Sequence, residues 1–489
     1  MRHVLLAALC LAGCAGPAEE LTPTPAAPDA GTAPVEAAPA EAAPVEAAPA
    51  EAAPAEAAPV EAAPAVVTLE ARALWVTRWD FASAEDVRGI LRRARAAGFN
   101  LVLFQVRGVA DAYYRSSLEP WAASLAGRLG KDPGWDPLQV AVDEAHALGL
   151  ELHAWVNLAT AWKGASPPGR SSPRHLLRAH PAWRVVDRQG RPMPCTDAGY
   201  VFVCLANPEV QAHLEAVLVE IATRYAVDGV HLDYARYPAR DTSYDRASNR
   251  LFRAARARDR SLTRAAWQRE ELTRFIGRLR DALHAARPGL LVSAAVTGIW
   301  QDLWGWGGVT QGFHDFHQDS HLWAARGVVD VLVPMIYWRP TRQPGARTDF
   351  RTLLAHFAPL REQIGLWAGI NVEAGDLTTL AEEVTLAREA GLPGVALFAW
   401  KALLDRGWLE ALPRELFPGP AARVPGRGAH SPGSPPDPPS SPGPSSPPGS
   451  NTSSVQPRRA MCAWLTSLGP ALVSSSSASL ASAESAPRK

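Results

Sequence analysis

Short apolar runs alternate with longer amphipathic stretches across residues 69–417. The runs have the length of buried strands, and the stretches repeat their apolar positions with the period of a helix. The pattern predicts strands at Ala71–Thr77, Leu101–Val106, Glu151–Val156, Gly229–Tyr234, Leu290–Val296, Val329–Ile336, Gly365–Asn371 and Gly394–Trp400. It predicts helices near Ala84–Ala97, Pro137–Leu148, Pro208–Ala226, Arg264–Ala286, Asp315–Arg326, Phe350–Arg361 and Leu377–Ala390.

This order of elements is typical of a (β/α)8 TIM barrel, in which each strand is followed by a helix. Glycine follows several predicted helices, as at Gly98, Gly149 and Gly391, and caps each helix before the next strand begins. An open doubly wound sheet is the alternative, but the chain lacks the glycine-rich phosphate turn of that fold. Two long connections, residues 158–205 and 238–261, leave the predicted C-terminal face, where long loops usually build a binding cleft.

The first 14 residues are typical of a lipoprotein signal peptide. A basic start precedes an apolar run that is too short to span a bilayer. The run ends Leu11-Ala12-Gly13-Cys14, which resembles a bacterial lipobox, so Cys14 is the expected lipidation site. The alternative is an ordinary signal peptide that is cut elsewhere. Both interpretations predict export.

The domain is flanked by two segments of low complexity. Residues 15–68 consist largely of Ala, Pro and Glu, with Glu-Ala-Ala-Pro recurring every five residues from Glu36 to Glu61. Frequent proline prevents a long helix there, so we expect a disordered, semi-rigid tether. Residues 418–489 are rich in Pro and Ser and are expected to be a disordered tail. The remaining residues, 69–417, are enough for one large domain.

The amino-acid composition narrows the range of possible functions. The chain has 49 basic and 49 acidic residues, which gives no indication of a nucleic-acid partner. Its 17 tryptophans offer flat faces that suit either core packing or sugar rings. Within the predicted domain, Cys195 and Cys204 are close together in an exported protein, so a disulfide between them is one expectation.

Polar and aromatic residues gather where the predicted strands end. Because side chains alternate along a strand, such residues can point into the mouth of a barrel. Asp233 ends the fourth predicted strand and is the leading catalytic candidate, whereas Asp228 and Asp330 precede strands and should cap loops at the opposite end. The residues expected to bind substrate are Gln105, Arg107, His153, Trp155, Asn157, His231, Tyr234, Arg236, Tyr237, Tyr337, Trp338, Asn371, Glu373 and Trp400.

Glycoside hydrolysis usually needs two carboxylic groups, so Asp233 requires a partner. Asp319 and Asp315 are the equal first candidates, one turn apart at the start of a predicted helix. Glu373 and Asp302 are further candidates. His314, His317 and His321 would share one face of that helix, but a single segment is a weak indication of a metal site. We expect no cofactor and no metal.

The residues also resemble a known family. The segments that carry the resemblance occur in one order and include Phe104–Arg107, Trp135–Leu138, Leu152–Asn157, Asp228–Tyr234 and Pro334–Trp338. Together they look like the glycosyl-hydrolase-like lipoproteins of the bacterial envelope, which include divisome-localised glycosyl hydrolases. The resemblance implies a (β/α)8 glycosidase that acts on peptidoglycan, with the acid of its fourth strand at Asp233. Members often have Asp-Asp-Tyr there, whereas this chain has Asp233-Tyr234.

The sequence therefore predicts an exported envelope lipoprotein that hydrolyses glycosidic bonds, with peptidoglycan as the expected substrate. Its expected partners are a glycan, the membrane through a lipid on Cys14, and envelope or division proteins. Ala15 after Cys14 favours the outer over the inner membrane by analogy, with the domain facing the periplasm. Two alternatives stay open, namely a glycan-binding lipoprotein without turnover and a glycosidase for an exogenous polysaccharide.

Overall fold

The computed structural model describes residues 68–341, 343 and 346–422. Within them, parallel strands follow one another around a closed circuit, because the last strand pairs with the first. The strands in circuit order are β2 (Ala71–Val76), β3 (Leu101–Arg107), β4 (Glu151–Asn157), β7 (Gly229–Asp233), β8 (Leu291–Thr297), β9 (Val331–Met335), β11 (Ala368–Asn371) and β12 (Gly394–Phe398). The predicted TIM barrel is confirmed, and β10 (Gly365–Leu366) adds a short pairing with β9.

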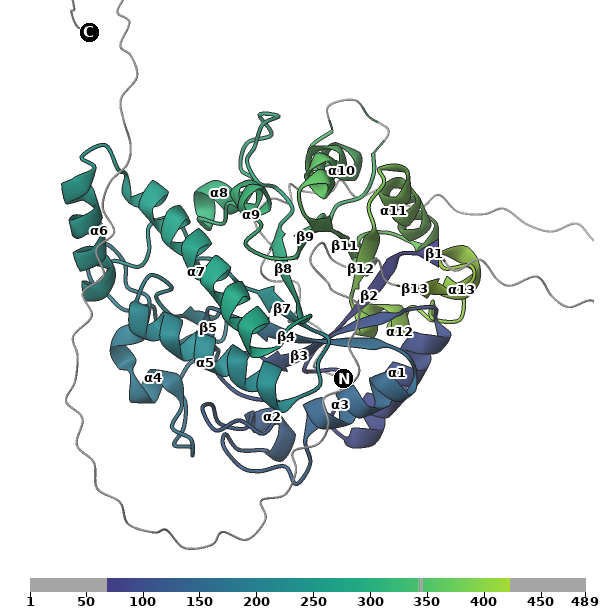
Figure 1. Ribbon diagram of the computed structural model, residues 1–489, viewed down its shortest axis with the longest axis horizontal. Coiled ribbons are helices and arrows are strands. Elements are labelled where there is room, and N and C mark those ends of the chain that lie inside the picture. Colours follow the sequence, from purple (N-terminus) through teal and green to yellow (C-terminus); the bar gives the residue numbers. More distant parts are fainter. Residues whose placement is uncertain (1–67, 342, 344–345, 423–489) are drawn as a thin grey trace, which may run out of the picture. The chain divides into compact units, whose positions relative to one another are not determined.

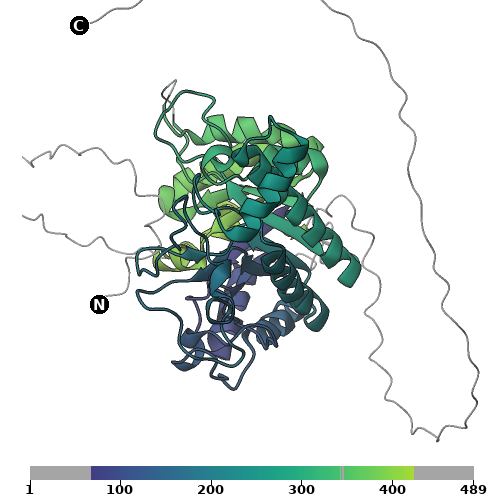
Figure 2. The same cartoon turned by 90° about the vertical axis from the view of Figure 1, so that its left-hand side faces the viewer.

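Helices surround this barrel in both views (Figures 1 and 2). The longer ones begin where polar side chains cap their first turn; at α1, for example, Ser83 accepts the amide N–H of Asp86, whose carboxylate in turn accepts the N–H of Ser83. The larger helices are α1 (Ala84–Ala96), α3 (Pro137–Ala147), α5 (Pro208–Arg224), α7 (Arg264–Ala286), α10 (Phe350–Phe357) and α11 (Leu377–Glu389). Shorter ones are α2 (Ala123–Ala126), α4 (Leu176–Ala179), α8 (Gly312–Asp315), α9 (Ser320–Arg326), α12 (Trp400–Asp405) and α13 (Leu412–Glu415).

The barrel interior is filled by side chains from alternate strand positions. Trp75, Trp155 and Trp367 occupy it together with small residues such as Ala73 and Ala396. A second, larger apolar layer lies between the strands and the helices. The interior is therefore a packed core, and chemistry is confined to the open end at the strand C-termini.

Three residues lock the opposite end of the barrel in the same way. Asn100, Asp228 and Asp330 each directly precede a strand, and each accepts the N–H of the second residue of the neighbouring strand, at 2.9, 2.8 and 2.7 Å. The carboxylates of Asp228 and Asp330 also bond the ring nitrogens of His146 and His284, both at 2.9 Å. The structural role predicted for the two aspartates is confirmed.

The first and last described segments meet at this same end. β1 (Thr68–Leu69) pairs with β13 (Ala421–Ala422), and the Arg72 guanidinium donates to the carbonyl of Gly419 at 2.9 Å. The described domain therefore extends slightly beyond the predicted 69–417. The predicted signal peptide, the Cys14 anchor, and nearly all of the predicted tether and tail lie outside the described residues.

Two local predictions were wrong. The helix expected at Asp315–Arg326 is interrupted, because His317 has a φ of 51° and Asp319 starts a new helix as its N-cap. The loop after β7 contains a helix that was not predicted, α6 (Arg246–Arg258), whose side chains are mostly exposed. No helix among the described residues has the length and apolar character needed to cross a bilayer.

The segment between Cys195 and Cys204 does not pair with itself. The strand in that segment, β6 (Val201–Phe202), pairs with β5 (Thr160–Trp162) instead. Both thiols are free, and the buried Cys204 thiol donates to the Arg184 carbonyl at 3.5 Å. The disulfide interpretation is corrected accordingly.

Candidate active site at the mouth of the barrel

Asp233 lies at the last position of β7, where the strand leaves the core. It is the register partner of Asn157, the last residue of β4. Both belong to the alternate positions that face the barrel interior, but Asp233 is only half-buried whereas Asn157 is 1% exposed. The carboxyl group is therefore placed at the mouth and remains accessible.

The surroundings of Asp233 favour its neutral form. Burial raises the pKa of Asp233, and the nearby Arg236 charge and the Tyr234 N–H, 2.6 Å from Oδ1, oppose that rise without cancelling it. The Trp155 indole also approaches the carboxyl, without the geometry of a full hydrogen bond. A carboxyl with a raised pKa can carry a proton to a leaving group near neutral pH.

Two tyrosines complete these surroundings. Tyr234 has a φ of 48°, so the chain turns sharply directly after Asp233. Burial and then the charge of Asp233 raise the pKa of Tyr337 well above its ordinary value, which places the phenol close to that carboxyl. The structure thus brings together Asp233, Trp155, Tyr234, Arg236 and Tyr337, all of which the sequence had singled out.

A polar layer continues from Asn157 to the first strand of the barrel. The Gln105 side chain donates to Asn157 Oδ1 and accepts the Arg78 N–H, both at 3.1 Å. Gln105 and Asn157 are almost completely buried. They therefore fix the positions of the strand ends and do not present their amides to a ligand.

Sequence reasoning missed the residues that follow β2. Arg78 is 3% exposed and forms no ion pair among the described residues; its Nη2 contacts the Tyr200 hydroxyl at 3.3 Å. Gly108 permits this position, because a Cβ there would lie 2.5 Å from the Arg78 guanidinium carbon. Trp79 is 66% exposed and lies beside that guanidinium, at 4.5 Å. The sequence feature that could have identified these residues is the segment Thr77–Asp80, which directly follows the first strand.

Asp80 is a further carboxyl at the same rim. Burial raises its pKa to about 6, against hydrogen bonds from Thr77, whose N–H is 2.6 Å from Oδ2. The nearest charges are those of Lys401 and Asp405 of α12. Burial therefore keeps the pKa of Asp80 above that of an ordinary aspartate. The charges that act on it come from α12 and not from the residues around Asp233.

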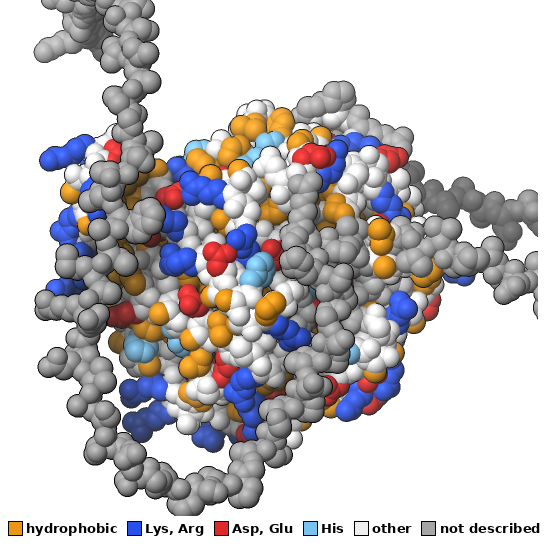
Figure 3. Space-filling model, viewed as in Figure 1, with side chains coloured by type: hydrophobic (Ala, Val, Ile, Leu, Met, Phe, Trp, Pro, Cys, Tyr) orange, Lys and Arg blue, Asp and Glu red, His pale blue; other side chains and the backbone are white. Residues whose placement is uncertain are grey.

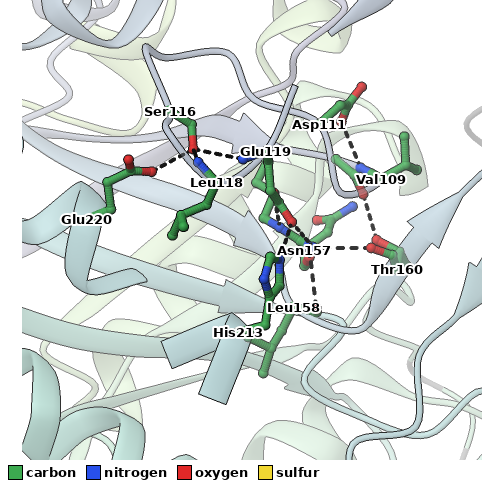
Figure 4. A network of polar contacts seen from close by, with 12 residues as sticks. Val109, Asp111, Ser116, Leu118, Glu119, Asn157, Leu158, Thr160, His213 and Glu220 are labelled. Atoms are coloured by element: carbon green, nitrogen blue, oxygen red, sulfur yellow. Dashed lines mark hydrogen bonds and ion pairs between the residues drawn. The ribbon is translucent and has the colours of Figure 1, made fainter. Parts of the chain in front are cut away.

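Arg107 was expected to bind substrate, and the structure corrects this expectation. Its side chain is completely buried and forms two 2.8 Å bonds with Glu119, which His213 also approaches at 3.3 Å. Burial favours a neutral Glu119, but the charge of Arg107 prevails and lowers the Glu119 pKa to about 2. Arg107 also donates to the carbonyls of Leu158 and Thr160, so the network holds the loop after β4 in place (Figure 4).

Four other expected substrate contacts lie in the core. His231 is completely buried, receives the Trp75 indole N–H at 3.1 Å and bonds Ser293 at 2.9 Å, and burial lowers its pKa to about 3. His153 is completely buried beside the Trp367 ring, and a Cβ on Gly229 would lie 2.6 Å from its ring. Tyr237 and Trp400 are also buried, 1% and 3% exposed. These side chains are corrected to packing roles, because no face is free for a ligand.

The candidate partner acids lie at the ends of a rim segment, residues 315–319. The segment packs on the chain that follows Asp233: the Phe316 carbonyl accepts the Tyr237 N–H at 3.0 Å, and Gln318 donates to the Ala235 carbonyl at 3.2 Å. Asp315 pairs with Arg240 at 2.8 Å. Asp319 accepts the Trp300 indole N–H at 3.0 Å and caps α9. Both acids are therefore near the chain after Asp233, and each also has a structural partner.

The remaining candidates lie in the loops after β8 and β11. Glu373 is exposed after β11, and Asn371 Oδ1 accepts its N–H at 3.1 Å. Asp302 accepts the N–H groups of Trp306 and Gly307 and shapes the loop after β8. Trp338 is half-buried, as are the stacked rings of Trp304 and Trp306, 4.5 Å apart. Aromatic faces therefore border the mouth on several sides.

The histidines considered for a metal do not converge. His314 is exposed, His317 bonds the Arg240 carbonyl at 3.0 Å, and His321 stacks on Trp300 at 4.1 Å. No group of three or more His, Cys, Asp or Glu side chains suited to a metal ion occurs in the described part of the chain.

Comparison with known proteins identifies relatives over most of this barrel. A family model described as "Glycosyl hydrolase-like 10" matches residues 70–372. The glycosyl hydrolase DigH of Escherichia coli K12 is 29% identical over 260 residues, which cover 52% of this chain and 57% of that protein. The glycosyl hydrolase YngK of Bacillus subtilis 168 is 25% identical over 287 residues, 55% of this chain and 54% of that protein. The chain thus spans about half the length of these relatives.

Solved structures agree with the fold. The glycoside hydrolase domain of PgaB (BpsB) from Bordetella bronchiseptica has a TM-score of 0.53 and 14% identity, covering 70% of this chain and 98% of that one. The catalytic domain of β-amylase from Paenibacillus polymyxa has a TM-score of 0.52 and 12% identity, covering 72% and 99%. At this identity the likeness concerns the barrel architecture alone.

Proposed function

Because the chain belongs to the glycosyl hydrolase-like 10 family, as its ordered motifs indicated, we propose that it is a glycoside hydrolase whose reaction takes place beside Asp233. The observation that supports this most directly is the position of Asp233, a half-buried carboxyl at the mouth of the barrel whose pKa is raised by burial. Active sites of TIM barrel enzymes lie at this end of the strands.

In the proposed reaction, Asp233 donates its proton to the glycosidic oxygen as the bond to the leaving sugar breaks. The anomeric carbon then bonds either to a water molecule that a second carboxylate deprotonates, or to that carboxylate itself, in which case water cleaves the resulting ester. The resulting carboxylate is stabilised by Arg236 and by the Tyr234 N–H, which already act on it in the free protein. Tyr337 and Trp155 confine the group and exclude water.

The second carboxylate is proposed from the rim segment, with Asp319 and Asp315 as alternatives. This segment packs directly on the chain after Asp233, so a modest adjustment on substrate binding brings either acid toward the cleft. Asp319 must then give up the Trp300 bond, and Asp315 the Arg240 ion pair. Variants of the two residues distinguish these alternatives.

We propose peptidoglycan glycan strands as the substrate and the bacterial envelope as the location. The relative DigH is named a glycosyl hydrolase, and the sequence begins with a lipobox-like segment ending at Cys14. A lipid on Cys14 and the following 54 residues up to Thr68 would hold the barrel at a membrane facing the periplasm.

The experiment that tests the proposed function is incubation of the full chain with purified glycan strands, with and without their peptides, followed by measurement of new reducing ends. Asp233→Asn removes the titrating proton with little change in shape and is expected to lower the rate at least about 100-fold. Asp143→Asn on the outer helix α3 is the matched control and is expected to retain full activity.

Equal rates for the wild type and Asp233→Asn would contradict the assignment of Asp233. Strand binding without release of reducing ends by any form would favour the glycan-binding alternative. Asp319→Asn and Asp315→Asn, measured beside them, show which acid completes the pair, because only that variant should approach the rate of Asp233→Asn.

A further inference from the structure

A hollow of about 540 Å³ lies beside α6, in the connection from β7 to α7. Its lining residues are Arg188, Tyr244, Asn249, Phe252, Arg256, Ser261, Leu262, Thr263 and Arg264. This connection begins a few residues after Asp233, so it belongs to the loops at the C-terminal face of the barrel. α6 lies at the edge of the molecule next to α7 (Figure 1).

Three arginines line this hollow, and their charge is only partly balanced. Arg188 pairs with Asp241 at 2.6 Å, whereas Arg256 and Arg264 form no ion pair among the described residues. The Arg264 guanidinium instead donates to Asn249 Oδ1 at 2.9 Å and to the Ser243 carbonyl, and its Nε has no hydrogen-bond partner. The hollow therefore carries excess positive charge.

The nearby acids offset this charge only in part: the Asp245 charge acts on Arg264, but the arginines of α6 and of the residues after it outnumber the acids. Asp245 is 7% exposed and caps α6 by accepting the Ser248 N–H at 3.0 Å. Asp259 is occupied by the N–H and hydroxyl of Ser261, at 2.9 and 2.6 Å. The N-terminus of α7 also lies here, since Thr263 is its N-cap, and its dipole adds to the attraction for an anion.

The outer face of α6 extends the same charge. Its exposed arginines form no ion pairs with the described residues, and the space-filling view shows Lys and Arg side chains along this edge (Figure 3). The exposed arginines of the segment are Arg246, Arg250, Arg253, Arg256, Arg258 and Arg260. A single basic helix of this kind attracts polyanions over the range of the Debye length.

The surface suits an acidic glycan better than a membrane. A helix that inserts into a bilayer presents large apolar side chains on one open face. In α6 the large apolar residues Leu251 and Phe252 are half-buried against the domain, and Ala254 and Ala257 are the apolar residues that are fully exposed. Tyr244 offers an aromatic face, with Arg264 4.1 Å above its ring, next to the positive charge.

We propose that this hollow, hereafter the α6 hollow, is a second glycan-binding site that recognises a carboxylate on the sugar strand. Arg256 and Arg264 bind the carboxylate, and the aromatic rings of Tyr244 and Phe252 contact the apolar parts of the sugar. The inference rests on the proposed function in that it assumes a glycan substrate, and it specifies that the strand is acidic. Binding here would hold the strand on the same face of the barrel as Asp233.

The test measures binding without turnover, with full-length Asp233→Asn protein at low salt. The probes are peptidoglycan glycan strands with free carboxylates and the same strands after their carboxylates are converted to amides. Arg256→Gln is expected to weaken binding of the acidic strands about tenfold, as for loss of a charge-assisted hydrogen bond. Arg258→Gln, on the same helix but outside the hollow, is the matched control, with an expected change below about twofold.

Two further readouts complete the test. The amide strands should bind the parent protein about as weakly as the acidic strands bind Arg256→Gln, and Arg256→Gln should melt at the temperature of the parent, because Arg256 is exposed. Equal weakening by Arg256→Gln and Arg258→Gln would overturn the proposal in favour of diffuse attraction. Equal binding of both strand types, or no measurable binding, would overturn it as well.

The outcome is independent of catalysis. If neither the wild type nor Asp233→Asn released reducing ends, the proposed function would fail while the binding measurement stood. If the strands were cleaved by the wild type but bound without regard to Arg256 or carboxylates, the α6 hollow alone would be refuted.

Discussion

Asn157 and Asp233 are register partners at the ends of adjacent strands, yet their side chains have different environments. Asn157 is buried and bonded to Gln105, whereas Asp233 is half-buried and accepts the N–H of the residue that follows it. One position fixes the strand ends and the other leaves a titrating group at the mouth.

Arg236 should set the pH dependence of hydrolysis. Its charge lowers the Asp233 pKa against the larger effect of burial, so Arg236→Gln is expected to raise that pKa further. The limb of the pH–rate profile that reports Asp233 should then move to higher pH. Arg236→Lys keeps the charge and should shift it less; an unchanged limb in Arg236→Gln would show that Asp233 does not control the rate.

Breaking the buried pair of Arg107 and Glu119 should be costly. Glu119→Gln leaves the buried Arg107 charge without its partner and is expected to lower the unfolding free energy by about 3–5 kcal/mol. Chemical denaturation at pH 7 measures this. The exposed Glu85→Gln, which removes a surface pair with Arg92, is the control and should cost below about 1 kcal/mol.

The same pair gives a pH dependence with a defined sign. The Glu119 pKa is lowered from 4.5 to about 2 in the folded chain, so its contribution is fully present above pH 4.5 and is lost as the pH falls toward 2. The wild type should therefore lose its advantage over Glu119→Gln in that interval. A constant difference between pH 5 and pH 2 would contradict the assignment.

Glu383 should behave in the opposite way. It lies 1% exposed in α11, and burial together with Glu382 raises its pKa from 4.5 to about 8. The wild type should therefore lose stability as the pH rises from 4.5 through 8, because the folded state must then bury a charge. Glu383→Gln has no carboxyl group to ionise at this position. Its melting temperature should therefore rise relative to that of the wild type as the pH increases across this interval. Parallel melting curves would show that Glu383 does not titrate there.

Replacement of Gly108 by alanine should lower the stability of the domain. A Cβ there would displace the buried Arg78 guanidinium from 2.5 Å, and overpacking of this kind costs about 1–3 kcal/mol. Gly89 in α1 is the matched control, since a Cβ there meets nothing within 4 Å and alanine favours the helix. Denaturation should show Gly108→Ala less stable and Gly89→Ala at least as stable as the wild type.

Cys195 and Cys204 should remain unlinked thiols in the oxidised protein. Both are free in the structure, with Cys204 buried. Unfolding without a reductant, alkylation and peptide mapping should find both residues alkylated. Recovery of a linked Cys195–Cys204 peptide would contradict the structure.

The barrel was predictable because its signal repeats. Each strand is a short apolar run, and each buried helix has an apolar stripe, so the alternation persists over the whole domain. Asp228 and Asp330 were interpreted correctly for a related reason, since their position before a strand fixes which end of the barrel they occupy.

The site was harder to predict because position on a strand does not report depth. His153 and His231 occupy strand positions that face the barrel interior, as Asp233 does, but they lie deeper. Both are completely buried, His153 beside the Trp367 indole and His231 beside the Trp75 indole. Arg107 is at a strand end, but its partner Glu119 comes from a loop that no periodicity describes. α6 escaped prediction because arginines make up much of it and leave it few apolar residues, although those few lie on one face.

The pairing of β1 with β13 brings the entrance and the exit of the domain to one point, at the pole opposite Asp233. A pull on the chain before Thr68 would therefore act at the base of β2, where Asn100 bonds Ala421 of the last described strand and Arg72 bonds Gly419 just before it. If Cys14 anchors the chain as proposed, such a pull would load the end of the barrel opposite Asp233.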